Sequence, residues 1–258
     1  MKIGVFDSGL GGLTILKAIV KELPQYDYEF FGDTANLPYG DKAEEEIYEL
    51  TKQAVIELFK KDCLLIIIAC NTASAETLRK LQTEFLSKTY PDRRILGVII
   101  PTLEELVERG IKNSFLIGTN RTIDSQKYSL EIKKRGLDIK LNSIATPELV
   151  PLIESGQLTE ASTIIKNILE QSHQEEAIVL GCTHYTILRE DLTETAKKTH
   201  CQIVAQDLII PKKLKSYLTN HPELSARLSQ DATRNIFLSQ HNPHYDQLLA
   251  ELLQGRFV

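Results

Sequence analysis

The chain has 258 residues, which is long enough for one large domain or two modest ones. Hydrophobic residues make up 42% of it, so a buried core is expected and global disorder is excluded. The formal net charge of -5 argues against a general nucleic-acid binder, which would usually be basic.

No segment is predicted to target the chain to a membrane or to cross one. The N-terminal apolar stretch in MKIGVFDSGLGG ends in glycines after a few residues, which is unlike a secretory signal. The longest apolar run, residues 64–70, is far shorter than the roughly 20 residues of a transmembrane helix. We therefore expect a soluble, cytoplasmic protein.

Strands and helices are predicted to alternate in the first part of the chain. Strands are expected over residues 3–7, 26–33, 64–69 and 94–100, and helices over residues 12–23, 44–61 and 74–87. The stretch LLIIIA is apolar throughout, as in strands of a parallel sheet that is covered on both faces. This alternation predicts an α/β fold with a mostly parallel sheet.

The same pattern starts again near residue 113. Further expected elements are strand, turn and helix over 113–136, a strand over 138–145, helices over 147–171, strands at 177–182 and 201–206, a helix from Pro211, an apolar stretch at 234–240 and a terminal helix at 245–254. We expect two similar α/β lobes related by pseudo-two-fold symmetry, each a mostly parallel sheet flanked by helices. Residues 1–96 plus 209–258 would form the first lobe and residues 97–208 the second, with the active site in the cleft between them.

Two cysteines occupy corresponding places in the two halves. Cys70 follows one apolar run and Cys182 follows another, and each is followed by small polar residues that can open a helix. A thiol at such a turn would meet unpaired backbone N–H groups and the positive end of the helix dipole, which lower its pKa. Two such thiols facing one another would form a two-base proton-transfer site.

The other two cysteines, Cys63 and Cys201, are interpreted as small buried apolar residues. The wide spacing of all four, with no CxxC pair, argues against a zinc site and against a disulfide framework. No metal site is predicted. The scattered histidines, including His241 and His244, are interpreted as surface residues.

Small polar residues follow several of the predicted strands, at the edge of a parallel sheet where ligands bind. They are Asp7-Ser8-Gly9, Gly32-Asp33-Thr34, Cys70-Asn71-Thr72, Gly118-Thr119 and Cys182-Thr183-His184. Hydroxyls and amides of this kind suit a compact, charged substrate. Neither a GxGxxG fingerprint after a strand nor a Walker A motif is present, so dinucleotide binding and nucleotide hydrolysis are not expected.

Six segments together resemble the glutamate racemase family: GVFDSGLGGLT, FFGDTANLPYG, ACNTASAETL, LIGTNRTI, TPELVPLIE and LGCTHYTIL. They occur in that family's order and spacing and span most of residues 1–190. The resemblance implies an isomerase that interconverts L- and D-glutamate without a cofactor and supplies D-glutamate for peptidoglycan. Its partner would be the small-molecule substrate, with no nucleic acid and no membrane. A homodimer is compatible with the sequence, which does not reveal the oligomeric state.

The resemblance also implies roles for individual residues. Cys70 and Cys182 would stand on opposite faces of the substrate α-carbon, one removing a proton as thiolate and the other returning one as thiol. The further catalytic residues implied are His184, Asp7, Asp33 and Glu154. The substrate-binding residues implied are Asp7, Ser8, Pro38, Tyr39, Gly40, Asn71, Thr72, Thr119, Thr122, Thr183 and His184. Simpler interpretations remain for three of these: a structural hydrogen bond for His184, a helix N-cap for Asp7 and a solvated helix position for Glu154.

The chain departs from the family pattern in three places. Thr186 stands where proline is common after CTHY, and Thr102 stands where glycine is usual after the proline of GVIIP. Gln206 and Asp207 occupy the slot of an Asp-Ser-Ala element. These changes leave both thiols in place and bear on lobe packing and substrate choice. Two other functions therefore stay open: racemisation of another small amino acid such as aspartate, and a degenerate racemase acting as a binding or regulatory protein.

Overall fold

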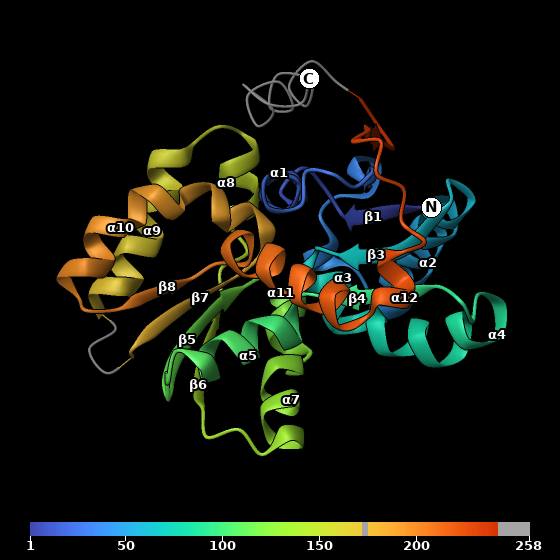
Figure 1. Ribbon diagram of the computed structural model, residues 1–258. Helices are drawn as coiled ribbons and strands as arrows, with labels where there is room; N and C mark the ends of the chain where they lie inside the picture. Colours follow the sequence, from blue (N-terminus) through green and yellow to red (C-terminus); the bar gives the residue numbers. More distant parts are fainter. Residues whose placement is uncertain (172–174, 242–258) are drawn as a thin grey trace.

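The computed structural model describes residues 1–171 and 175–241 and contains two parallel sheets flanked by helices (Figure 1). The first sheet has the strand order β4-β3-β1-β2-β9 and the second the order β6-β5-β7-β8. The strands are β1 (Lys2–Asp7), β2 (Tyr28–Gly32), β3 (Cys63–Ile68), β4 (Arg94–Gly97), β5 (Asn113–Gly118), β6 (Lys140–Ala145), β7 (Ala177–Gly181), β8 (Gln202–Val204) and β9 (Arg234–Leu238). We call each sheet with its helices a lobe.

The two lobes repeat one arrangement of strands. Read in the same direction, β4-β3-β1-β2 of the first sheet corresponds to β8-β7-β5-β6 of the second. The strand before Cys70 therefore corresponds to the strand before Cys182, and β1 corresponds to β5. This correspondence confirms the predicted two-lobe α/β fold.

Helices cover both faces of each sheet. They are α1 (Gly12–Glu22), α2 (Glu44–Lys60), α3 (Asn71–Lys80), α4 (Ser87–Thr89), α5 (Ile99–Glu108), α6 (Asn120–Asp124), α7 (Lys127–Arg135), α8 (Leu149–Glu154), α9 (Leu158–Gln171), α10 (Arg189–Lys198), α11 (Gln206–Asn220) and α12 (Pro222–Ser225). A π-helical segment (Leu81–Leu86) joins α3 to α4, and short 3-10 segments cover Thr34–Asn36, Tyr39–Asp41 and Thr183–Leu188.

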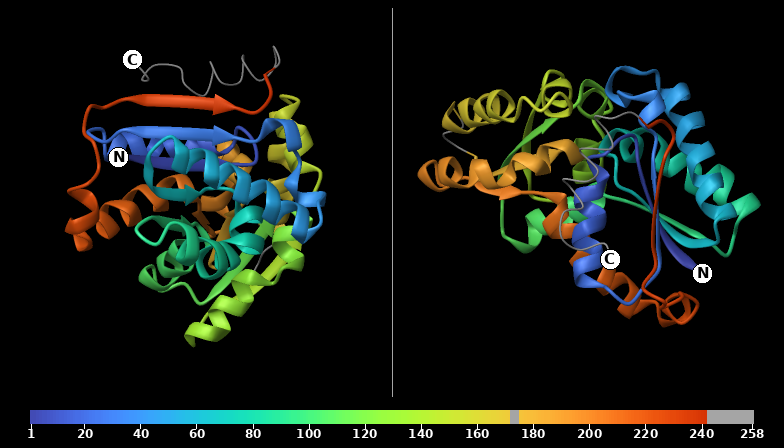
Figure 2. Two further views of the ribbon diagram at one scale, coloured as in Figure 1. Left: turned by 90° about the vertical axis from the view of Figure 1, so that its right-hand side faces the viewer. Right: turned by 90° about the horizontal axis from the view of Figure 1, so that it is seen from above.

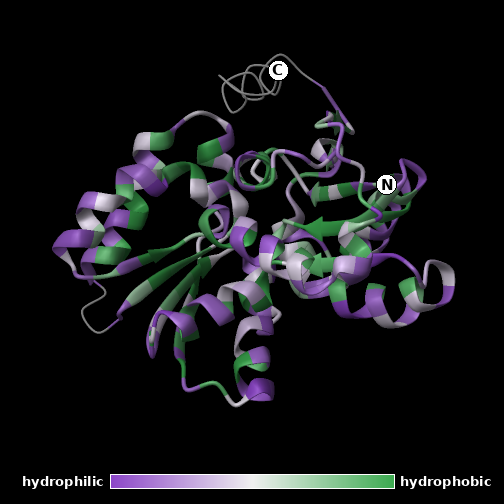
Figure 3. Ribbon diagram, in the orientation of Figure 1, coloured by the Kyte–Doolittle hydropathy of each residue, from purple (hydrophilic) through white to green (hydrophobic). Residues whose placement is uncertain are grey.

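The core of each lobe lies on both faces of its sheet, because an inner strand of each sheet, β3 or β7, has no polar side chain. All residues of β3 and β7 are buried. The helices turn their apolar sides inward and their polar sides outward, as the hydropathy colouring shows (Figure 3). Leu13, Leu16 and Ile19, for example, form the buried side of α1. Among the described residues, no helix is long and apolar enough to span a bilayer.

Helix α11 connects the two cores. Ile209 packs with the second lobe, whereas Ile210, Leu214 and Leu218 pack with α1 and the first sheet. The chain then returns to the first sheet, where β9 pairs in parallel with β2 (Figure 2). The apolar stretch at 234–240 thus joins the first lobe.

The structure differs from the sequence-based expectation at several boundaries, and two of these involve a proline. Strand β4 ends at Gly97 and α5 begins at Ile99, so the predicted strand end is wrong; Pro101 fits the first turn of a helix, where its missing N–H costs no hydrogen bond. The helix expected from Pro211 begins at Gln206, and Pro211 lies inside it. The terminal helix expected at 245–254, and His244, lie outside the described residues.

Candidate active site

The carboxyl ends of the central strands in both lobes lead into one small cavity. Ser8 follows β1, Cys70 follows β3, Thr119 follows β5 and Cys182 follows β7. The cavity is lined by Ser8, Leu37, Pro38, Tyr39, Gly40, Cys70, Asn71, Thr72, Thr119, Val150, Cys182, Thr183 and His184. Its volume is about 20 Å³, which is room for little more than one water molecule. The lobes are therefore closed on one another here.

Cys70 caps the N-terminus of α3. Its Sγ accepts a hydrogen bond from Ala73 N at 3.5 Å and lies 3.3 Å from Ser8 Oγ. Burial, and next the negative charge of Asp7, raise the pKa of the Cys70 thiol to about 12. The expectation of a lowered pKa is therefore wrong for Cys70 in the closed state, because burial outweighs the backbone N–H.

Asp7 stands behind Cys70 at the end of β1 and is fully buried. Its Oδ1 lies 3.3 Å from Ser8 Oγ and 3.3 Å from Gly9 N, while Oδ2 finds no hydrogen-bond partner among the described residues. Burial raises the pKa of Asp7, against the opposing charge of His184. Cys70, Ser8 and Asp7 thus form a short polar chain that leads away from the cavity.

Cys182 has a different neighbour. Its Sγ lies 3.7 Å from His184 Nδ1, and His184 Nε2 lies 2.8 Å from Glu154 Oε1. Burial by itself would lower the pKa of His184, but its hydrogen bonds to Cys182 and Glu154 raise that pKa well above its usual value. Cys182 precedes a 3-10 segment, but unlike Cys70 its side chain makes no hydrogen bond to a backbone N–H of that segment. The local partner of this thiol is therefore an imidazole rather than a helix terminus.

Three threonines join the lobes beside the cavity. Thr72 Oγ1, on α3, lies 2.9 Å from Thr119 Oγ1 and 3.2 Å from Thr122 Oγ1. Thr119 caps α6 by accepting from Thr122 N at 3.2 Å. Hydroxyls both donate and accept, so this cluster can exchange its internal hydrogen bonds for bonds to a polar ligand.

Asp33 lies behind the cavity wall instead of lining it. Its carboxylate accepts hydrogen bonds from Tyr39 OH at 2.7 Å, from Asn36 Nδ2 at 3.0 Å and from Ser239 Oγ at 2.8 Å. Burial, and then the charge of Asp33, raise the pKa of Tyr39 above its usual value, so its hydroxyl is a donor. Asp33 therefore fixes the loop that presents Tyr39 and Gly40.

Two glycines of DSGLGG, Gly11 and Gly12, lie so close to neighbouring side chains that a Cβ atom would not fit. A Cβ on Gly12 would stand 2.5 Å from Asp7 Oδ2, and one on Gly11 would stand 2.6 Å from Thr183 Oγ1 in the second lobe. A hydrogen-bonding pair nearby, Thr14 Oγ1 and Thr186 Oγ1 at 2.8 Å, also joins the lobes. Thr186, which replaces the family's proline, thus contributes to lobe packing.

The structure brings most of the residues singled out from the sequence to this one cavity. Asp7, Asp33, Glu154 and Thr122 stand behind the lining, in contact with residues that line it. The sequence analysis missed Leu37 and Val150, two apolar lining residues that carry no chemical signal apart from their place in the motif segments. No group of three or more His, Cys, Asp or Glu side chains within the described parts of the chain could hold a metal ion.

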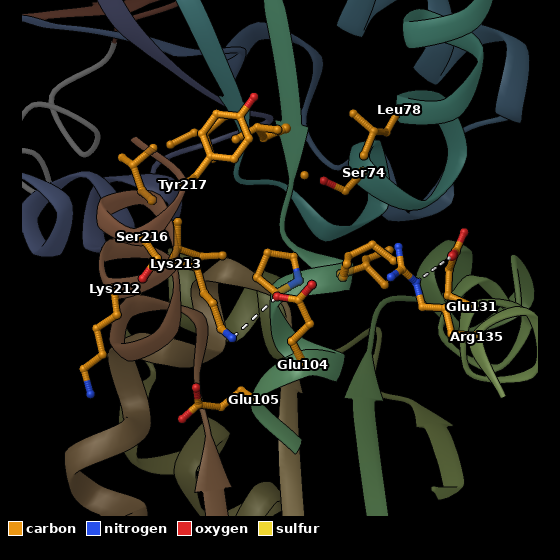
Figure 4. A pocket seen from close by; sticks show the side chains of 18 of the residues that line it. Ser74, Leu78, Glu104, Glu105, Glu131, Arg135, Lys212, Lys213, Ser216 and Tyr217 are labelled. Carbon is orange, nitrogen blue, oxygen red and sulfur yellow. Dashed lines mark hydrogen bonds and ion pairs between the residues drawn. The ribbon is translucent and has the colours of Figure 1, made fainter. Parts of the chain in front are cut away.

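A second, larger cavity of about 670 Å³ lies between α3, α5, α7 and α11 (Figure 4). Ion pairs mark its walls: Lys213 Nζ lies 3.5 Å from Glu104 Oε2, and Arg135 Nε lies 3.4 Å from Glu131 Oε2. None of the residues predicted for the active site lines it. The larger cavity is therefore separate from the small cavity that contains the two thiols.

The sequence model of the Asp/Glu/Hydantoin racemases matches residues 3–206. The chain belongs to this family. Racemases are isomerases, so the chain is an enzyme of that class. The glutamate racemase of Ruegeria sp. (strain TM1040) is 36% identical over 239 residues, which cover 87% of this chain and 87% of the relative.

Solved structures of this racemase family have the same fold. Glutamate racemase from Francisella tularensis subsp. tularensis, in complex with D-glutamate, has a TM-score of 0.83 and 28% identity, covering 100% of this chain and 95% of that chain. A glutamate racemase isoform from Bacillus anthracis has a TM-score of 0.85 and 25% identity, covering 99% and 94%. The family relationship thus extends over the whole two-lobe architecture.

Proposed function

We propose that the chain interconverts L- and D-glutamate by moving the α-proton between Cys70 and Cys182. The observation that carries the proposal is that two buried thiols, on corresponding turns of the two lobes, line one small polar cavity. Both the base and the acid are side chains, so the proton transfer needs no cofactor. The relatives named glutamate racemases support glutamate as the substrate.

The surroundings of Cys182 suit a base, and the resemblance to the family implies that this base acts on L-glutamate. A protonated His184 beside Sγ stabilises a thiolate, and Glu154 on the far side of the ring stabilises the imidazolium. The Cys182 thiolate takes the α-proton and becomes a thiol, while the electron pair of the broken C–H bond stays on the α-carbon. Hydrogen-bond donors that line the cavity stabilise this charge.

Cys70 supplies the second proton. Because the raised pKa of Cys70 keeps it a thiol at neutral pH, it is ready to donate to the opposite face of the α-carbon. D-Glutamate results, and Cys70 is left as a thiolate. In the reverse reaction this Cys70 thiolate takes the α-proton of D-glutamate, and the Cys182 thiol returns a proton to the opposite face. When D-glutamate instead meets the resting form, in which Cys70 is a thiol, the proton must first leave Cys70, and Ser8 and Asp7 form the path for it.

The substrate enters only when the lobes separate. Glutamate is many times larger than the water-sized cavity, so the contacts between Thr72 and Thr119 and between Thr14 and Thr186 must open or be exchanged for bonds to the ligand. We propose that the lobes move as two units, residues 1–96 with 209 onward and residues 97–208, with the ammonium and carboxylates held by the polar lining. D-Glutamate made in this way would supply peptidoglycan synthesis.

The test is a measurement of optical activity. Purified protein is mixed with L-glutamate and, separately, D-glutamate in heavy water, with aspartate as the control substrate and no added cofactor. Loss of the circular-dichroism signal from both glutamate enantiomers, with deuterium entering the α-position, supports the proposal. Activity on aspartate alone would keep the mechanism and change the substrate, and a folded protein inactive on every amino acid would favour a binding or regulatory role.

A further inference from the structure

A fully buried glutamine sits at the start of α11, at the junction of the lobes. Gln206 Nε2 donates to Asn71 Oδ1 at 2.9 Å, and Gln206 Oε1 accepts from Asn71 Nδ2 at 2.7 Å. The two amides therefore pair reciprocally. Tyr128 OH donates to Asn71 Oδ1 at 2.7 Å, and Thr102 Oγ1 lies 3.3 Å from Gln206 Nε2.

This network joins four helices. Asn71 is the first residue of α3, Gln206 is the first of α11, and Thr102 and Tyr128 lie on α5 and α7. The same four helices enclose the larger cavity, although none of the four network side chains lines it (Figure 4). The network thus lies where both lobes and the thiol turn meet.

The network is linked to the thiol by the peptide bond between Cys70 and Asn71. Asn71 follows Cys70 directly, and Cys70 is the N-cap of α3. Since Asn71 Oδ1 accepts from both Tyr128 and Gln206 while its Nδ2 is held by Gln206 Oε1, second-lobe and α11 side chains fix the first residue of α3. A displacement of about 1 Å at a reacting group costs on the order of 100-fold in rate.

We propose that Gln206 is a positioning residue that holds Cys70 in place through Asn71, with Tyr128 and Thr102 as supports. An amide suits this place because its separate donor, Nε2, and acceptor, Oε1, pair with Asn71 Oδ1 and Nδ2 at the same time. An ionised glutamate here would turn one carboxylate oxygen toward Asn71 Oδ1, so that two acceptors face each other in a fully buried place. Thr102 and Gln206 both differ from the residues usual in the family, and in the structure the two side chains form a hydrogen bond with each other.

The first variant to test is Gln206→Met, which keeps the size and removes both polar groups. Its matched control is Gln202→Met on the exposed part of β8. We expect the variant to fold, kcat to fall about 100-fold for both enantiomers, and KM to change much less than kcat, because the thiol moves together with Asn71, which is one of several polar residues lining the cavity. Gln206→Glu should be at least as impaired, and Thr102→Ser, which keeps the hydroxyl, should resemble the unmodified protein.

A second readout does not depend on racemisation. Iodoacetamide labelling of Cys70, measured by peptide mass spectrometry against Cys182 in the same sample, should be at least about fivefold faster in Gln206→Met, because the start of α3 opens more often. If the unmodified protein fails to racemise glutamate, the proposed function falls and this labelling ratio alone decides the positioning role.

Either of two results would overturn the inference. One is a folded Gln206→Met protein with kcat within about twofold of the unmodified protein, or with a loss confined to KM or to melting temperature. The other is an unchanged labelling ratio. If Gln206→Met does not fold, Tyr128→Phe makes the same comparison by removing one O–H, with an expected kcat loss of about tenfold.

Discussion

Glu154 Oε1 lies 2.8 Å from His184 Nε2, on the side of the ring away from Cys182. Each thiol thus reaches a carboxylate through one polar side chain, Cys182 through an imidazole and Cys70 through the hydroxyl of Ser8. An imidazolium carries a charge and a hydroxyl does not. The two thiols are therefore matched in position but differ in their electrostatic surroundings.

Cys70→Ala or Cys182→Ala should each stop racemisation in both directions, because either change removes one of the two proton carriers. The expected loss in kcat is at least about 100-fold, by the circular-dichroism assay. Cys63→Ala is the control, since that thiol is buried in β3 and does not line the cavity. Near-normal turnover by Cys70→Ala would contradict the two-base mechanism.

Glu154→Gln should move the alkaline limb of the pH–kcat profile for L-glutamate to lower pH. The carboxylate helps to hold the pKa of His184 up, and without it burial lowers that pKa, so the imidazolium is lost at a lower pH. Because the pKa of His184 is higher in the folded state than in the unfolded chain, protonation of His184 stabilises the fold. This stabilisation is fully present below the usual histidine pKa and is lost as the pH rises through the pKa of His184 in the folded state. Glu160→Gln, on the exposed side of α9, should leave the profile unchanged.

Asp33→Asn should lower folding stability and substrate affinity, with a smaller effect on kcat. The carboxylate accepts from Tyr39, Asn36 and Ser239, and an amide would turn a donor toward some of them. We expect a loss of about 1–3 kcal/mol in unfolding free energy, by urea titration, and a raised KM. Asp41→Asn, exposed in the same loop, is the control. A large fall in kcat at unchanged KM would instead make Asp33 a catalytic residue.

Cys63→Ala should make the free energy of unfolding fall less steeply as the pH rises into the alkaline range. Burial, and then the charge of Glu29, raise the pKa of Cys63 to about 12, whereas a thiol in the unfolded chain ionises near pH ~8.5. Between these values the unfolded state has released a proton that the folded state keeps, so stability falls with pH by up to about 1.4 kcal/mol per unit. Urea unfolding at several pH values measures the slope. Equal slopes in Cys63→Ala and the unmodified protein would refute this, and Val55→Ala controls for the loss of buried volume.

The sequence predicted the two-lobe fold well because its signals are local. Apolar runs such as LLIIIA and AIVLG are buried strands, and the amphipathic spacing in α1 matches its buried side. The early start of α11 was missed because Pro211 was taken as a helix start, whereas burial of Ile209 and Ile210 in two different cores favours continuous helix through it.

For the candidate site, the sequence predicted the residues within its short motifs but not the contacts that form between the lobes. The turns that carry Cys70 and Cys182 each contain their own polar residues, so their positions follow from the strands. The pairing of Gln206 with Asn71, 135 residues apart, and the high pKa of Cys70 depend on how the lobes close, which no local pattern encodes.

Strand β9 gives the chain an unusual order of assembly during synthesis. The strands of the second lobe, β5 to β8, leave the ribosome as one uninterrupted block, whereas the outer strand of the first sheet emerges only after them. Until residues 234–238 arrive, β2 has an open edge, and until α11 arrives the part of the apolar side of α1 that does not face the sheet is uncovered. The lobe that is translated first is therefore the last to be finished, and the nascent chain carries an aggregation-prone edge through most of its synthesis.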